Sequence, residues 1–152
     1  IRDRLLSDYT VTIPEIGAFT ATVPPIMIIT SNRTRDVHDA LKRRCLHLYI
    51  PFPDTDLEER IVSAKVPHIS QKLRTQLVAF IQELRDMDLK KVPAISETID
   101  WAKTLILLNV ENLSPNLVRD TLNVILKFQE DIETVNSEIN NVTSKALVQK
   151  QK

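Results

Sequence analysis

The spacing of apolar and polar positions changes along this chain, and the change separates a strand-like part from a helical part. Residues 10–22 alternate β-branched and polar side chains around Gly17, the only glycine, which predicts a β-hairpin. Residues 26–31 form an unbroken β-branched run, which predicts a central strand covered on both faces. A short helix is expected through residues 36–41 and a second strand at residues 46–50, before a proline-rich turn closes this part.

From Asp54 onward the apolar residues follow helical spacing. Asp54 is a good N-cap residue, and an amphipathic helix is predicted directly after it. Two further segments each carry one apolar stripe. These stripes consist of Leu73, Leu77, Phe80, Ile81, Leu84 and Met87 in the first segment and of Ile99, Ala102, Leu105 and Ile106 in the second.

The last helix is predicted to begin at Ser114, an N-cap residue followed by proline in the first turn. Its apolar residues repeat every seven positions in two registers. The registers are Val118, Ile125, Ile132 and Ile139, and Thr121, Phe128, Val135 and Val142. This pattern predicts one long helix whose first half packs on its neighbours and whose polar end frays; the alternative is a coiled-coil contact with another chain.

Composition narrows the class of protein. With 152 residues, of which 43% are hydrophobic, the chain can build one ordinary core or two small ones. Lysine plus arginine equals aspartate plus glutamate, so an electrostatic function has to be local. The single cysteine, Cys45, excludes an internal disulfide and fits a reducing compartment, so we expect a cytoplasmic protein. No apolar run approaches the roughly 20 residues that span a bilayer, and no membrane partner is expected.

Two features near the predicted strands could carry chemistry. Asn32 follows residues 26–31, and open α/β sheets bind ligands at the carboxyl ends of their strands, where an amide can orient a water or touch a phosphate. The alternative is a turn-starting asparagine. Arg43 and Arg44 lie between the short helix and the second strand, and their planar, permanently charged groups suit the γ-phosphate of a nucleotide bound by a neighbouring subunit. The alternative is a solvated basic turn paired with nearby aspartates.

The order of these features resembles the second half of an AAA+ ATPase module. The segments most similar to the MoxR family of that superfamily are LLSDYTVTIPEIG, TSNRTRDVHDALKRRC, PDTDLEERIVSAKVP and SETIDWAKTL. The resemblance extends to about Glu130 and implies an α/β fragment of an AAA+ P-loop NTPase core followed by an all-α lid bundle, mostly helical overall. The implied parts are residues 1–53 for the end of the core, 54–130 for the lid and 131–152 for a C-terminal helix extension or tail.

The resemblance also implies roles for single residues. Asn32 matches the sensor-1 residue, which polarises the attacking water or contacts the γ-phosphate of ATP. Arg44, directly before a cysteine, matches the arginine finger that acts on the neighbouring subunit, and Arg43 is the second candidate. Residues 10–22 match the pre-sensor hairpin of this clade.

One position departs from the family pattern. Many AAA+ lids carry a sensor-2 arginine where this chain has Glu97, and a carboxylate repels phosphate. We therefore expect a lid without a sensor-2 contact, unless Lys90 and Lys91 or another subunit supply it.

A larger departure is the missing phosphate-binding loop. A P-loop needs the pattern GxxxxGK[ST], which a chain with one glycine cannot contain, and no apolar strand ends in Asp-Glu to hold magnesium. In the family both motifs lie upstream of Ile1, so we expect the C-terminal portion of a longer protein. ATP and Mg²⁺ are then cofactors of the full-length parent, and this portion alone should neither bind ATP tightly nor hydrolyse it. Residues 26–31 and 46–50 would lack their neighbouring strands, and we expect exposed apolar surface there.

The function implied by the resemblance is that of a homo-oligomeric ring, often hexameric, which uses ATP hydrolysis to remodel or activate client proteins, commonly with a partner that carries a von Willebrand factor A domain. A second hypothesis is a non-catalytic helical interaction module whose heptad stripe binds a partner protein. Nucleic-acid binding is the weakest hypothesis because the net charge is zero. Its candidate residues are Arg33, Arg35, Lys42, Arg43 and Arg44.

A metal site is not expected. Cys45 and His47 would share one face of the predicted second strand and could in principle bind zinc. The other histidines, His38 and His68, have no matching partners, so Cys45 is interpreted as a small core residue.

Overall fold

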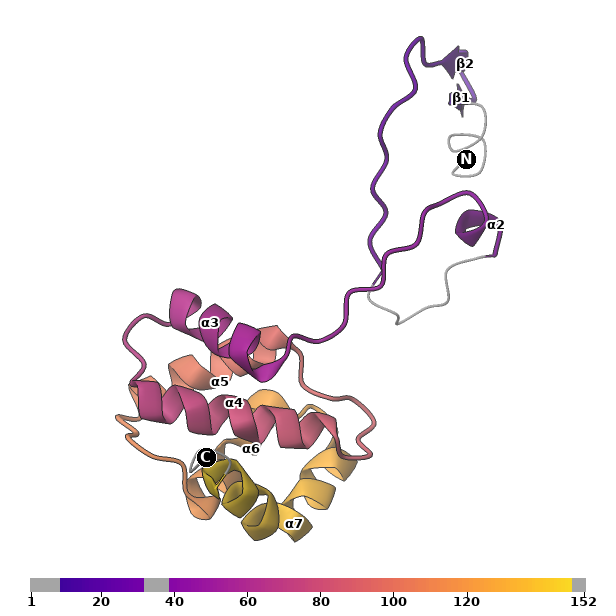
Figure 1. The fold of residues 1–152 in the computed structure, drawn as a ribbon. Coiled ribbons are helices and arrows are strands. Elements are labelled where there is room, and N and C mark those ends of the chain that lie inside the picture. Colours follow the sequence, from indigo (N-terminus) through magenta and orange to yellow (C-terminus); the bar gives the residue numbers. More distant parts are fainter. Residues whose placement is uncertain (1–8, 32–38, 149–152) are drawn as a thin grey trace. The chain divides into compact units, whose positions relative to one another are not determined.

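The computed structural model describes residues 9–31 and 39–148 (Figure 1). The chain divides into two units, Ile1–Ile50 and Pro51–Lys152. The described part of the first unit contains two short strands and a short helix, and that of the second unit is helical throughout apart from its turns. The protein is therefore mostly helical with a small two-stranded sheet.

The predicted hairpin is confirmed. Strand β1 (Thr10–Ile13) pairs antiparallel with β2 (Gly17–Thr20), and the register places Thr10 opposite Thr20. The hydroxyl groups of these two threonines are 3.1 Å apart and hydrogen-bonded. Gly17 has a φ of 105°, a conformation that side chains rarely adopt, so the single glycine lies where the turn requires it.

The two further strand predictions are wrong for the described residues. Residues 26–31 and 46–50 have no regular secondary structure, and the described sheet consists of β1 and β2 alone. Ile26 is 94% exposed and Leu48 is 82% exposed, so the apolar surface expected at these segments is present. A strand forms only where a neighbour takes its backbone hydrogen bonds, and sequence preference does not supply that neighbour.

Part of the short helix predicted at residues 36–41 lies outside the described residues. The described helix, α2 (Asp39–Lys42), forms a single turn directly before the two arginines.

The second unit is a bundle of five described helices: α3 (Thr55–Lys65), α4 (Gln71–Arg85), α5 (Ile95–Leu107), α6 (Pro115–Ile125) and α7 (Gln129–Val148). Side-chain caps start three of them. Asp54, Ser70 and Ser114 accept backbone hydrogen bonds at 2.8, 3.2 and 3.4 Å from the third residue after each cap. The helix starts predicted at Asp54 and at Ser114 are thereby confirmed.

Helix α4 is the centre of the bundle, because it packs against α3, α5 and α7 (Figure 1). Its predicted apolar stripe faces the core. There the ring centroids of Phe80 and of Trp101 on α5 are 5.4 Å apart. The Trp101 indole donates a hydrogen bond of 2.9 Å to the Thr121 hydroxyl on α6, so the one polar atom of this buried ring is satisfied. The buried members of the two predicted stripes are Leu73, Leu77, Phe80, Ile81, Leu84, Ala102 and Leu105, with Met87, Ile99 and Ile106 partly buried.

The predicted long C-terminal helix is interrupted. Helix α6 ends at Ile125, the next residue, Leu126, is extended (φ −110°, ψ 136°), and α7 begins at Gln129. The interruption lets α7 pack against both α6 and α4, which buries apolar residues from both helices in the same core. The buried heptad positions are Val118, Thr121, Ile125, Val135, Ile139 and Val142. The buried part of the heptad stripe therefore packs within this unit.

Candidate functional site

The cationic turn that follows α2 contains two of the three predicted site residues. The backbone N–H of Arg43 donates to the carbonyl of Asp39 at 3.0 Å and so continues the helical turn. The side chains of Arg43 and Arg44 are exposed. Asn32, the predicted sensor-1 residue, lies outside the described residues. Its position relative to Arg43 and Arg44 is therefore not described.

The residues considered and rejected as metal ligands are described only in part. Cys45 is half-buried and His47 is exposed, while His38 lies outside the described residues. Within residues 9–31 and 39–148, no group of three or more histidine, cysteine, aspartate or glutamate side chains could hold a metal ion. The same residues include no helix with the length and apolar character needed to cross a membrane.

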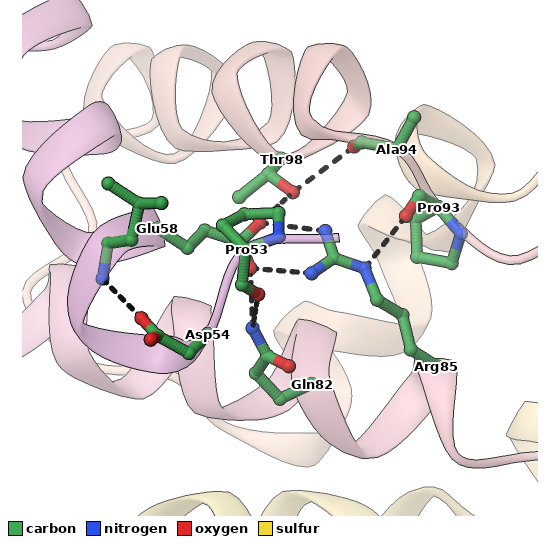
Figure 2. A network of polar contacts seen from close by, with 9 residues as sticks. Pro53, Asp54, Glu58, Gln82, Arg85, Pro93, Ala94 and Thr98 are labelled. Carbon is green, nitrogen blue, oxygen red and sulfur yellow. Dashed lines mark hydrogen bonds and ion pairs between the residues drawn. The ribbon is translucent and has the colours of Figure 1, made fainter. Parts of the chain in front are cut away.

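The helical unit contains a buried polar cluster that the sequence analysis did not identify (Figure 2). Glu58, in the first turn of α3, is fully buried. Arg85, in the last turn of α4, donates two hydrogen bonds to its carboxylate, from Nη1 to Oε2 at 2.6 Å and from Nη2 to Oε1 at 2.8 Å. Gln82 donates to Oε2 at 2.7 Å, and the Thr98 hydroxyl of α5 donates to Oε1 at 2.9 Å.

This arrangement explains how a charge can be buried at Glu58. An unpaired carboxylate is very costly inside a protein, and here four hydrogen bonds, two of them from the bidentate arginine, compensate for the lost water. Arg85 is satisfied in turn, because its Nε donates to the carbonyl of Pro93 at 3.0 Å and the ring of Phe52 lies 4.6 Å from its central carbon. The cluster thus connects α3, α4, α5 and the segment before α3.

A signal for this pair is present in the sequence. Glu58 precedes the buried Val62 by four positions, and Arg85 follows the buried Ile81 by four. Residues four apart lie on the same face of a helix, so both charged residues occupy positions of an apolar stripe. Opposite charges at core positions of two helices indicate a buried pair.

Glu97, the residue at the position predicted for sensor 2, contacts other residues of the helical unit. Glu97 accepts a hydrogen bond of 2.7 Å from the Ser96 hydroxyl, and its carboxylate lies 3.9 Å from the Lys91 ammonium. Partial burial raises the pKa of Glu97, but the hydrogen bonds from Ser96 and from the backbone, together with the charge of Lys91, outweigh this and lower the pKa below its usual value. Glu97 therefore stays ionised at neutral pH and presents a negative charge.

The two lysines considered as substitutes for sensor 2 are engaged near the start of α7. The carboxylate of Asp131, which is 3% exposed, accepts the backbone N–H groups of Lys90 and Lys91 at 2.8 and 3.2 Å. The Lys90 ammonium lies 3.5 Å from Glu130 and 4.8 Å from the centroid of Phe128. Each lysine thus has an acidic partner in the helical unit.

Comparisons with protein-family models, with curated proteins and with solved structures found no match to this chain. The described residues define a small hairpin unit and an all-helical bundle.

Proposed function

We propose that this chain is the C-terminal portion of a MoxR-like AAA+ ATPase, containing the end of the nucleotide-binding core and the helical lid. The observation that carries the proposal is the exposure of two strand-like segments, residues 26–31 and 46–50, on either side of the cationic turn. Unbroken β-branched runs are typical of strands that are covered on both faces. In an AAA+ core the covering strands would come from the half that carries the P-loop.

Within this proposal the cationic turn acts between subunits. Arg44, with Arg43 as the second candidate, reaches the γ-phosphate of the ATP bound by the next subunit of the ring. Their exposure on the turn after α2 supports this role, because an arginine finger has to extend from its own subunit. Asn32 contacts the nucleotide of its own subunit and orients the attacking water.

The reaction is a displacement by water at the γ-phosphate, with Mg²⁺ held by residues outside this chain. The ring uses the energy of hydrolysis to remodel or activate a client protein, together with a partner that carries a von Willebrand factor A domain. Because Glu97 stands at the sensor-2 position, the proposed lid lacks a sensor-2 contact unless Lys90 and Lys91 or another subunit supply it.

The test is a mixed-ring experiment with the full-length protein. Arg44→Ala removes the finger that each subunit gives to its neighbour, while a P-loop variant destroys the site but keeps the finger. Rings of either variant alone are expected to be inactive. Mixed rings are expected to recover ATPase activity, because the P-loop variant supplies its finger to the intact site of an Arg44→Ala subunit.

Arg43→Ala is the matched control in this experiment. If Arg44 is the finger, Arg43→Ala rings keep their activity without mixing; the opposite result moves the role to Arg43. No recovery with either arginine variant contradicts a trans-acting finger. The proposal as a whole is contradicted if about 200 codons upstream of Ile1, a typical domain length, encode neither a P-loop nor an apolar strand ending in Asp-Glu.

A further inference from the structure

Residues 52–54, which lead into α3, are held on the helical unit by three contacts, of which Figure 2 shows those of Pro53 and Asp54. The Phe52 ring lies 4.6 Å from the central carbon of the Arg85 guanidinium. The carbonyl of Pro53 accepts a hydrogen bond of 3.2 Å from Gln82. The carboxylate of Asp54 accepts the backbone N–H of Leu57 at 2.8 Å and caps the helix.

Two of these contacts depend on the same buried carboxylate. Arg85 and Gln82 both donate to Glu58. These hydrogen bonds fix the Arg85 guanidinium against the Phe52 ring and the Gln82 side-chain amide against the Pro53 carbonyl. The cation–π contact adds attraction between the Phe52 ring and the guanidinium of Arg85. Proline at position 53 restricts its own φ and the conformation of the residue before it, so few backbone rotations are left in this segment.

We propose that Glu58 and Arg85 form a positioning clamp for residues 52–54, so that the freedom of the chain begins upstream of Pro51 and not at the start of α3. A rotation of the helical unit then carries Phe52 with it, because the segment moves as part of the bundle. The proposal rests on contacts within the helical unit and is independent of the proposed ATPase function.

The first test is backbone ¹⁵N relaxation of the whole chain in solution. The amides of Phe52 and Asp54 are expected to show order parameters of about 0.85, as in rigid backbone, and those of Tyr49 and Ile50 values below about 0.6. A Phe52 amide as mobile as that of Tyr49 overturns the clamp.

The second test removes the contacts to the segment and keeps the buried pair. Phe52→Ala combined with Gln82→Met is expected to lower the order parameter at position 52 to the upstream values, with the amides of α3 to α5 unchanged. Phe52 is 47% exposed, so its loss does not open the core. Leu57→Ala is the matched control, since Leu57 is 44% exposed on α3 and should leave position 52 ordered.

The third test removes the pair itself. In Glu58→Met/Arg85→Met, apolar side chains of similar length replace both charges, a change that buried pairs often tolerate. A bundle that stays helical by circular dichroism and loosens at position 52 supports the clamp. A helical bundle with position 52 still ordered overturns it, and if this variant does not fold, the result of the second test decides.

Discussion

The two units of this protein use similar apolar residues in opposite ways. In the helical unit Phe80, Leu84 and Val118 are fully buried, whereas Ile26 and Leu48 of the first unit lie almost completely exposed. The difference follows from the backbone. A helix satisfies its own N–H and C=O groups and needs neighbours only for its side chains, but a strand needs neighbours for both. A chain segment can therefore complete a bundle and still leave its strands unformed.

The largest effect is expected from breaking the buried pair. Arg85→Ala leaves the carboxylate of Glu58 buried without its main partner and should lower the free energy of unfolding of the helical unit by about 3–5 kcal/mol. Urea denaturation followed by circular dichroism measures this change. The control is Lys103→Ala, which breaks an exposed pair with Asp100 and should cost less than about 1 kcal/mol. Similar losses in the two variants would contradict the assigned role of the pair.

The second largest loss of stability is expected from a substitution at the interruption between α6 and α7. Leu126 is 1% exposed although it belongs to neither heptad register, whereas the register residue Phe128 is 38% exposed. Leu126→Ala should therefore cost about 2–5 kcal/mol, as other buried leucines do, and Phe128→Ala clearly less. Both values come from urea midpoints. A reversed order would favour the uninterrupted helix predicted from the heptads.

The comparison of the two units can be tested directly at Ile28. This side chain is 87% exposed, so Ile28→Ala should change the stability of this chain by no more than about 0.5 kcal/mol. If the chain is part of a longer AAA+ ATPase as proposed, the same residue would lie in a covered strand of that protein, and the same substitution there should cost about 2–5 kcal/mol. Thermal or urea unfolding of both proteins measures the difference. Equal small effects would show that the segment stays uncovered in the parent.

The smallest effect concerns Glu97. Its pKa is lower in the folded protein than in the unfolded chain, where it is about 4.3, so its ionised form stabilises the fold above that pH. This contribution is lost as the pH falls through the lower folded pKa. Glu97→Gln should therefore reduce stability at neutral pH, and the difference from the unmodified protein should shrink in acid. Urea midpoints over a series of acidic pH values measure it; a difference that does not depend on pH contradicts the lowered pKa of Glu97.

Local signals in the chain are sufficient for several features. Gly17 marks the hairpin turn, Asp54 and Ser114 mark helix starts, and the apolar stripe that contains Leu77 identifies the face of α4 that enters the core. Each of these depends on residues within a few positions of one another, through backbone conformation, capping or helical period. The same local signals identify the cationic turn that contains Arg43 and Arg44.

Other features depend on residues that are distant in sequence, and only packing decides them. Glu58 becomes a buried pair partner because Arg85 reaches it from another helix, and the chain leaves the helical path at Leu126 because α7 gains more by packing on α4 than by extending α6. The two segments predicted as strands, residues 26–31 and 46–50, show the converse, since local preference without a neighbouring strand leaves them exposed. Local preferences amount to fractions of a kcal/mol per residue, and burial or pairing of a side chain exceeds them several-fold.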